Sequence, residues 1–316
     1  MKRIVPSLVF AAMLVSDVAL GSEPENSLVV GAELFQRGWK SDQGIGTPIN
    51  IPAAIRLYRQ AADLGNPLAK GRLVRLYLNG NCVQRDQRQA EKLATAAFPQ
   101  LLEAAKQNNA VAQMIVGTMY AEGLGTARDS DGAFRWLTKA ANQNLALAQA
   151  NLGVMYENGW SVPIDLAEAA KWYSQAAGQN SAMGQAYLGL LYYEGHGVPC
   201  DKVEAERLFR LSAQQNFPEA ETNLGYMYEH GCIVGRHSCE AVRLYRLAAE
   251  QNLAVAQTNL GTMYQKGCGV ARDLNEAMKW YQRAADQGDA NAREALRCLT
   301  CEPVLYYCPR TRCWCW

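Results

Sequence analysis

One segment of the chain returns every 36 residues, and this period limits the possible folds more than any other feature. Residues 148–180, AQANLGVMYENGWSVPIDLAEAAKWYSQAAGQN, have a related copy one period upstream and three further copies downstream. A fixed period of this size is typical of a solenoid, in which similar supersecondary units stack along an axis. Each unit buries its apolar face against its neighbours, so the array needs no single large core.

The repeated residues of each unit predict two helices joined by a short loop. Four positions recur on one stripe of the first helix, which we expect to be buried: Ala112, Val116, Met119 and Tyr120. Asp129 and its equivalents can cap a second helix, and Ser238 can do so in the one unit that has His237 instead. The second helix is expected to bury one large side chain per unit, namely Trp136, Trp172, Leu208, Leu244 and Trp280.

Glycine and asparagine recur at two further places. A glycine in the middle of a helix costs about 1 kcal/mol relative to alanine. Its recurrence in each first helix predicts a neighbouring helix that passes too close for a Cβ atom, at Gly117, Gly153, Gly189, Gly225 and Gly261. The second helices are expected to end at residues that readily take the left-handed conformation, namely Gly65, Asn108, Asn144, Asn180, Asn216, Asn252 and Gly288.

The boundaries of the units follow from where the period holds. The first unit, residues 28–68, is degenerate, and we expect a lengthened loop over residues 39–52. The second unit, residues 69–111, has seven extra residues, which equal two helical turns. They predict one long helix over residues 87–106, which Pro99 should kink or break. The rest divides into five regular units at residues 112–288, a capping helix at 289–299 and a cysteine-rich tail at 300–316.

The frame A-x-x-x-L-G-x-x-Y-x-x-G-x-G-V-x-x-D-x-x-x-A-x-x-W-Y-x-x-A-A, which residues 256–285 match at nearly every position, resembles the Sel1-like repeat, a relative of the tetratricopeptide repeat. The resemblance covers roughly residues 30–299. It implies an all-α, right-handed solenoid of antiparallel helix pairs. It also implies an adaptor that binds a protein or peptide, because the family mostly holds partner proteins in exported, membrane-associated or ER settings. We expect no cofactor.

The N-terminus has the pattern of a secretory signal peptide. Residues 1–3 are basic at two positions, residues 4–15 are mostly apolar, and small residues precede a cut after Gly21. The apolar run is shorter than the roughly 20 residues that span a bilayer. We therefore expect residues 1–21 to be cleaved, with no transmembrane segment in the mature chain. Secretion or a periplasmic location fits better than the ER lumen, since the chain has no retention signal and no N-x-S/T sequon.

Charge and motifs narrow the possible functions. The net charge of +1, with both signs interspersed, argues against a general grip on nucleic acid. The sequence contains no S-x-x-K, G-x-S-x-G or H-E-x-x-H motif and no phosphate loop, so we expect no enzyme activity. A hydrolase acting on β-lactam-like or cell-wall substrates stays the alternative, because some cysteine-rich Sel1-like proteins carry such labels.

Ten cysteines favour an oxidising compartment. Cys232 and Cys239 are expected to form a disulfide that staples the loop of their unit. Together with His230 and His237 they could instead bind zinc, which leaves a metal-binding protein as a second alternative. A disulfide-knotted C-terminal cap is expected from the remaining candidates, Cys298, Cys301, Cys308, Cys313 and Cys315, with Cys268 or Cys200 as further members.

Three positions of each first helix lie about 100° from the buried stripe and vary from unit to unit. A fixed scaffold with one variable face is the pattern of a concave binding groove, although ordinary solvated positions would vary in the same way. Tyr187 and Tyr226 favour the groove, because tyrosine is a good interface anchor. The predicted partner-binding residues are Asn151, Tyr187, Leu190, Asn223, Tyr226 and Asn259.

Overall fold

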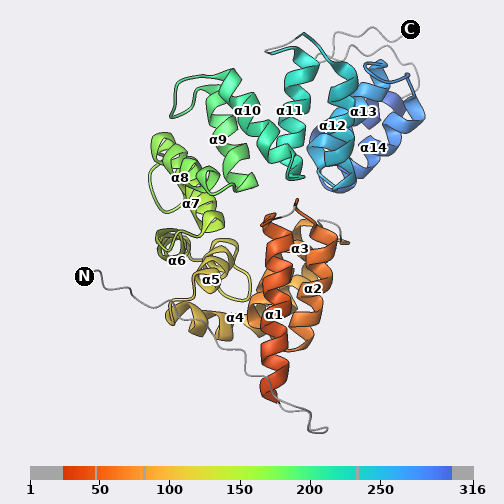
Figure 1. Cartoon of the computed structure of the whole chain (residues 1–316). Helices are drawn as coiled ribbons and strands as arrows, with labels where there is room; N and C mark the ends of the chain where they lie inside the picture. The colour runs from red at the N-terminus through yellow and green to blue at the C-terminus, as the bar shows by residue number, and fades with distance from the viewer. Residues whose placement is uncertain (1–23, 47, 81–82, 233–234, 301–316) are drawn as a thin grey trace.

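The computed structural model describes residues 24–46, 48–80, 83–232 and 235–300. These residues form fifteen α-helices and no strand (Figure 1). The helices are α1 (Pro24–Gln43), α2 (Ile51–Asp63), α3 (Pro67–Asn79), α4 (Gln87–Lys106), α5 (Ala110–Glu122), α6 (Ser130–Asn142), α7 (Ala146–Asn158), α8 (Leu166–Gly178), α9 (Ala182–Glu194), α10 (Lys202–Ala213), α11 (Pro218–His230), α12 (Ser238–Glu250), α13 (Ala254–Lys266), α14 (Leu274–Asp286) and α15 (Ala290–Thr300).

The helices pack in sequential pairs, each against the one before and the one after it. This confirms the predicted all-α solenoid. Several odd-numbered helices also contact the next odd-numbered helix, as α7 does with α9 and α11 with α13, whereas the even-numbered helices make no comparable contacts with each other. The odd-numbered helices therefore line the inner side of the curve that Figure 1 shows.

The recurring glycines mark close approaches between the two helices of a unit, as predicted. A Cβ atom on Gly153 would lie 2.5 Å from the Tyr173 ring, and one on Gly225 would lie 2.9 Å from the Tyr245 ring. Opposite this glycine, the second helix of each regular unit buries a large side chain, namely Leu137, Tyr173, Phe209, Tyr245 and Tyr281. The preceding residue was expected to be the buried one. That is wrong for Trp136 and Trp172, which are only half-buried, because the next residue fills the space above the glycine.

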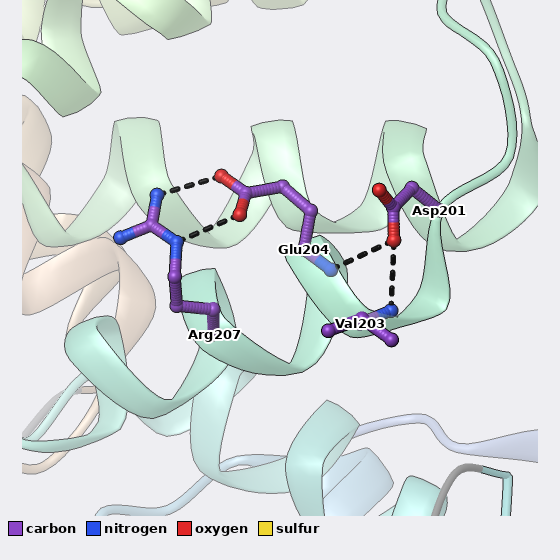
Figure 2. A network of polar contacts seen from close by, with 4 residues as sticks. All are labelled: Asp201, Val203, Glu204 and Arg207. Carbon is purple, nitrogen blue, oxygen red and sulfur yellow. Dashed lines mark hydrogen bonds and ion pairs between the residues drawn. The ribbon is translucent and has the colours of Figure 1, made fainter.

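The helix ends follow the predicted local rules. Asp201 caps α10 by accepting hydrogen bonds from the backbone N–H groups of Val203 and Glu204, both at 3.0 Å (Figure 2). The equivalent aspartates cap α6, α8 and α14. A cap from Ser238 was wrong, because this residue is already the first of α12 and His237 precedes it without a side-chain cap. All seven predicted helix-ending residues have a positive φ.

The first unit differs from its prediction. The helix α1 continues through Gly38 to Gln43, so the expected loop over residues 39–52 is wrong in its first part. The continuation has a physical reason, because it buries Trp39 and places the Asp42 carboxylate against Arg72 of α3 and Tyr58 of α2. These contacts fix the degenerate unit to its neighbour.

The second unit contains the expected long helix. α4 covers the predicted span without interruption, so Pro99 does not break it. In the part of the chain that the structure describes, no helix is both long and apolar enough to cross a membrane. The proposed signal peptide, residues 1–21, and the tail beyond Thr300 lie outside the described residues.

Candidate functional site

The predicted partner-binding residues lie on four successive odd-numbered helices. Asn151 is on α7, Tyr187 and Leu190 are on α9, Asn223 and Tyr226 are on α11, and Asn259 is on α13. We call these six residues the inner face. Tyr226 is 43% exposed, and the other five are half-buried. The inner face therefore combines one protruding aromatic ring with shallower polar and apolar side chains.

Three asparagines occupy the same register of the inner face. Asn151, Asn223 and Asn259 stand at equivalent positions of α7, α11 and α13. None of their amides makes a hydrogen bond to another residue within the described ranges, whereas most buried amides of the molecule are paired. A primary amide offers donors and an acceptor together. Each of these side chains can therefore bond to the N–H and C=O groups of a peptide backbone.

An aromatic cluster surrounds Tyr226. Its ring stacks on the His230 imidazole with centroids 4.0 Å apart, and it meets the Tyr193 ring edge-on at 6.3 Å. The ammonium of Lys202 lies 5.6 Å from the centroid of the Tyr193 ring. These contacts restrict the Tyr226 side chain before a partner binds. A restricted, exposed tyrosine loses little conformational entropy on binding, which suits an interface anchor.

Tyr187 is a less prominent anchor than its sequence position suggested. Its ring packs against Tyr173 with centroids 5.4 Å apart. Burial, and then the carboxylate of Glu219, raise the pKa of Tyr187 to about 12. The guanidinium of Arg75, on α3, acts on the same hydroxyl in the opposite direction. Its packing against Tyr173 leaves Tyr187 half-buried, so it offers a partner less contact area than Tyr226 does.

Sequence reasoning missed three charged residues near the inner face. Arg75 forms an ion pair with Glu122 that joins α3 to α5. Glu219 occupies a column that is apolar in the other regular units, and this is the signal that could have identified it. Burial raises the pKa of Glu219, and its shielded Oε2 atom has no hydrogen-bond partner among the described residues.

The histidines and cysteines of the α11–α12 region do not gather into a ligand set. His230 stacks on Tyr226, whereas His237 packs edge-on against Tyr228 at 6.0 Å. Within the described residues no three histidine, cysteine, aspartate or glutamate side chains stand where they could hold a metal ion. Cys232 and Cys239 are free thiols in the structure, so their pairing stays a prediction. Cys298 lies on α15. The four cysteines after it lie outside the described residues.

Comparison with known proteins gives a consistent result. The model of the Sel1 repeat matches the chain seven times, at residues 35–66, 68–97, 110–145, 146–181, 182–217, 218–253 and 254–289. A solved Sel1 repeat protein from Oxalobacter formigenes is 32% identical with a TM-score of 0.59, over 73% of this chain and 86% of that one. A protective antigen of uropathogenic Escherichia coli strains, which displays an SLR fold, is 29% identical with a TM-score of 0.53, over 88% and 67% of the two chains. No curated protein sequence matched.

Proposed function

Because this chain belongs to the Sel1 repeat family, we propose that it is a non-enzymatic scaffold that holds a protein or peptide segment along its inner face. Sel1 repeats mediate protein interactions. The observation that carries the proposal is the row of unpaired amides at Asn151, Asn223 and Asn259 beside the exposed ring of Tyr226.

The chemistry of this row fits an extended segment of polypeptide. Amides at equivalent positions of α11 and α13 can bond to backbone groups a few residues apart in a bound chain, since an extended chain offers such groups at regular intervals. Tyr226 adds apolar contact area at the same place, and tyrosine is enriched among the residues that dominate binding energy. The partner would then be recognised by its backbone along the row and by one side chain at Tyr226.

The inner face can be tested with the triple variant Asn223→Ala, Tyr226→Ala and Asn259→Ala. We expect it to bind the partner at least about tenfold more weakly, because loss of one anchor of this kind typically costs more than about 1.4 kcal/mol. The fold should persist, since none of the three side chains is fully buried. The measurement is capture of the partner by the mature chain, followed by an affinity titration with the captured protein.

A matched control is available on α10. Glu204 and Arg207 form an exposed ion pair on this second helix (Figure 2). Replacing both by alanine removes polar groups of similar number away from the inner face, and exposed pairs contribute little to stability. This control should bind normally. Equal capture by the triple variant and the control would contradict the assignment of the inner face.

We further propose that the protein is exported, on the strength of its basic, short apolar and small-residue N-terminus. The mature protein isolated from its host should begin at Ser22, and an intact mass that retains residues 1–21 would contradict export. In an oxidising compartment Cys232 and Cys239, which flank the loop between α11 and α12, would form a disulfide. Two free thiols in the mature protein would contradict this pairing.

A further inference from the structure

Hydrogen bonds between side-chain amides link consecutive units at most junctions of the array. At the α4–α5 junction, Gln113 donates through Nε2 to Asn108 Oδ1 at 3.2 Å and accepts at Oε1 from Gln143 Nε2 at 2.7 Å. The same two bonds recur at three other junctions, where the sets are Gln149 with Asn144 and Gln179, Gln185 with Asn180 and Gln215, and Gln257 with Asn252 and Gln287. Each glutamine is therefore both a donor and an acceptor.

Glu221 stands at this position in the α10–α11 junction, and it is 1% exposed. One carboxyl oxygen accepts a hydrogen bond from Gln251 Nε2 at 2.9 Å, as the glutamine carbonyl oxygens do elsewhere. By equivalence with the other junctions, we infer that the other oxygen occupies the place of the amide nitrogen, which there donates to the asparagine five residues earlier. That asparagine is Asn216 here. Only a protonated carboxyl can supply the missing donor.

Asn216 also belongs to a long-range contact. Its Nδ2 donates to the backbone carbonyl of Ile49 at 3.3 Å, and the N–H of Ile49 donates to the carbonyl of Gln215 at 3.3 Å. Ile49 lies in the α1–α2 loop, so the bonds join the first unit to the end of α10. Figure 1 shows that the array curves until its later helices, α11 and α12, lie near the N-terminal helices α1 to α3. We call this pair of bonds the closing contact.

A second long-range contact shows how the amide network at a junction supports a contact with a distant part of the chain. Asn252 donates through Nδ2 to the carbonyl of Gly80 at 3.4 Å, while its Oδ1 accepts from Gln257 at 3.3 Å and from Gln287 at 3.2 Å. These two donors, one of them from the glutamine five residues later, hold the asparagine amide in the orientation that reaches the distant carbonyl. Asn216 also reaches a distant carbonyl, that of Ile49, but the residue five positions later is Glu221 instead of a glutamine. By the same equivalence, the unprotonated carboxylate would face Asn216 Oδ1 as one acceptor against another.

Ionisation of Glu221 therefore favours the opposite orientation of the Asn216 amide. A carboxylate attracts the Nδ2 hydrogens, and charge-assisted bonds are stronger than neutral ones. The turn would withdraw Nδ2 from Ile49 and leave Oδ1 facing its carbonyl. The charged groups that act on Glu221 are Arg243, on α12, and Glu219, on its own helix. Burial outweighs the hydrogen bond from Gln251 and the charge of Arg243, which both lower the pKa of Glu221, and raises that pKa to about 7.

We propose that Glu221 is a proton-controlled latch of the solenoid. In its protonated form it orients Asn216 towards Ile49 and maintains the closing contact. In its ionised form it turns Asn216 away and releases the α1–α2 loop from the end of α10. The latch involves residues outside the inner face and does not depend on the proposed function.

The test follows the backbone amide of Ile49 in the full mature chain by hydrogen exchange. Its protection factor, relative to the intrinsic exchange rate at each pH, should fall about fivefold or more between about pH 5.5 and about pH 8.5, which corresponds to loss of roughly one hydrogen bond. In Glu221→Gln the protection should stay constant, because glutamine supplies the donor at every pH. Constant protection in the wild-type chain, or an equal fall in Glu221→Gln, would overturn the proposal.

A matched variant separates the latch from general loosening. Gln149→Glu in the Glu221→Gln background moves the buried carboxyl to the α6–α7 junction, where Asn144 makes no long-range contact among the described residues. Its overall stability should depend on pH, but the protection of Ile49 should not. A fall at Ile49 in this variant would show that any buried carboxyl loosens the array, and the latch would be refuted.

Discussion

Replacing Asp42 by alanine is expected to lower the free energy of unfolding by about 3–5 kcal/mol, since it leaves a buried cation without its partner. Asp42 is 6% exposed and accepts hydrogen bonds from Tyr58 Oη at 2.8 Å and from Arg72 Nε at 3.0 Å. The Arg72 guanidinium also lies 5.3 Å from the centroid of the Trp39 ring. Chemical denaturation monitored by circular dichroism measures the loss.

The effect should be large because both partners of Asp42, Tyr58 and Arg72, depend on it. Burial, and then the Asp42 carboxylate, raise the pKa of Tyr58 well above its ordinary value, so Tyr58 stays a hydrogen-bond donor. Without Asp42, this hydroxyl and the guanidinium of Arg72 both lose their acceptor in a buried place. The control is Glu204→Ala, which breaks an exposed ion pair with Arg207 and should cost less than about 1 kcal/mol. An equal cost for the two variants would contradict this account of the first unit.

Replacing Glu221 by glutamine is expected to stabilise the protein at alkaline pH and to change little in acid. The pKa of Glu221 is about 7 in the folded chain against an ordinary value of 4.5, so the folded state binds the proton more tightly. The stability that this proton provides is fully present below about pH 4.5 and is lost as the pH rises through about 7. At about 1.4 kcal/mol per pKa unit, the loss amounts to roughly 3 kcal/mol.

Glutamine carries a permanent donor and avoids this loss. The difference in unfolding free energy between Glu221→Gln and the wild-type chain should therefore grow from near zero in acid to roughly 3 kcal/mol above neutral pH. Denaturant titrations at several pH values give this difference directly. A gain of the same size at every pH would mean that packing, not titration, distinguishes the two side chains.

Features that depend on neighbouring residues could be predicted from the sequence. The Asp201 cap and the left-handed turn at Asn180 each need only a few consecutive residues, and both are present. The close approach at Gly153 was also predictable, because a costly glycine that recurs in a helix needs a packing reason. The identity of the buried partner, Tyr173 instead of Trp172, required the actual rotation of α8 against α7.

Features that depend on the curvature of the whole array could not be predicted. The contact between Ile49 and Gln215 joins residues 166 positions apart. It arises from small rotations that accumulate over several units, and no local pattern encodes their sum. Glu221 was visible in the sequence as a glutamate in a column of glutamines, but its significance depends on where Asn216 points.

The claim that the inner face holds a partner is tested most directly by photo-crosslinking in the native host. A photoreactive phenylalanine analogue would replace either Tyr226, on the inner face, or Lys171, an exposed residue of α8. We expect one defined protein adduct from the Tyr226 position and none of that mass from the Lys171 position. An adduct from Lys171 with none from Tyr226 would place the partner on the outer helices and contradict the account.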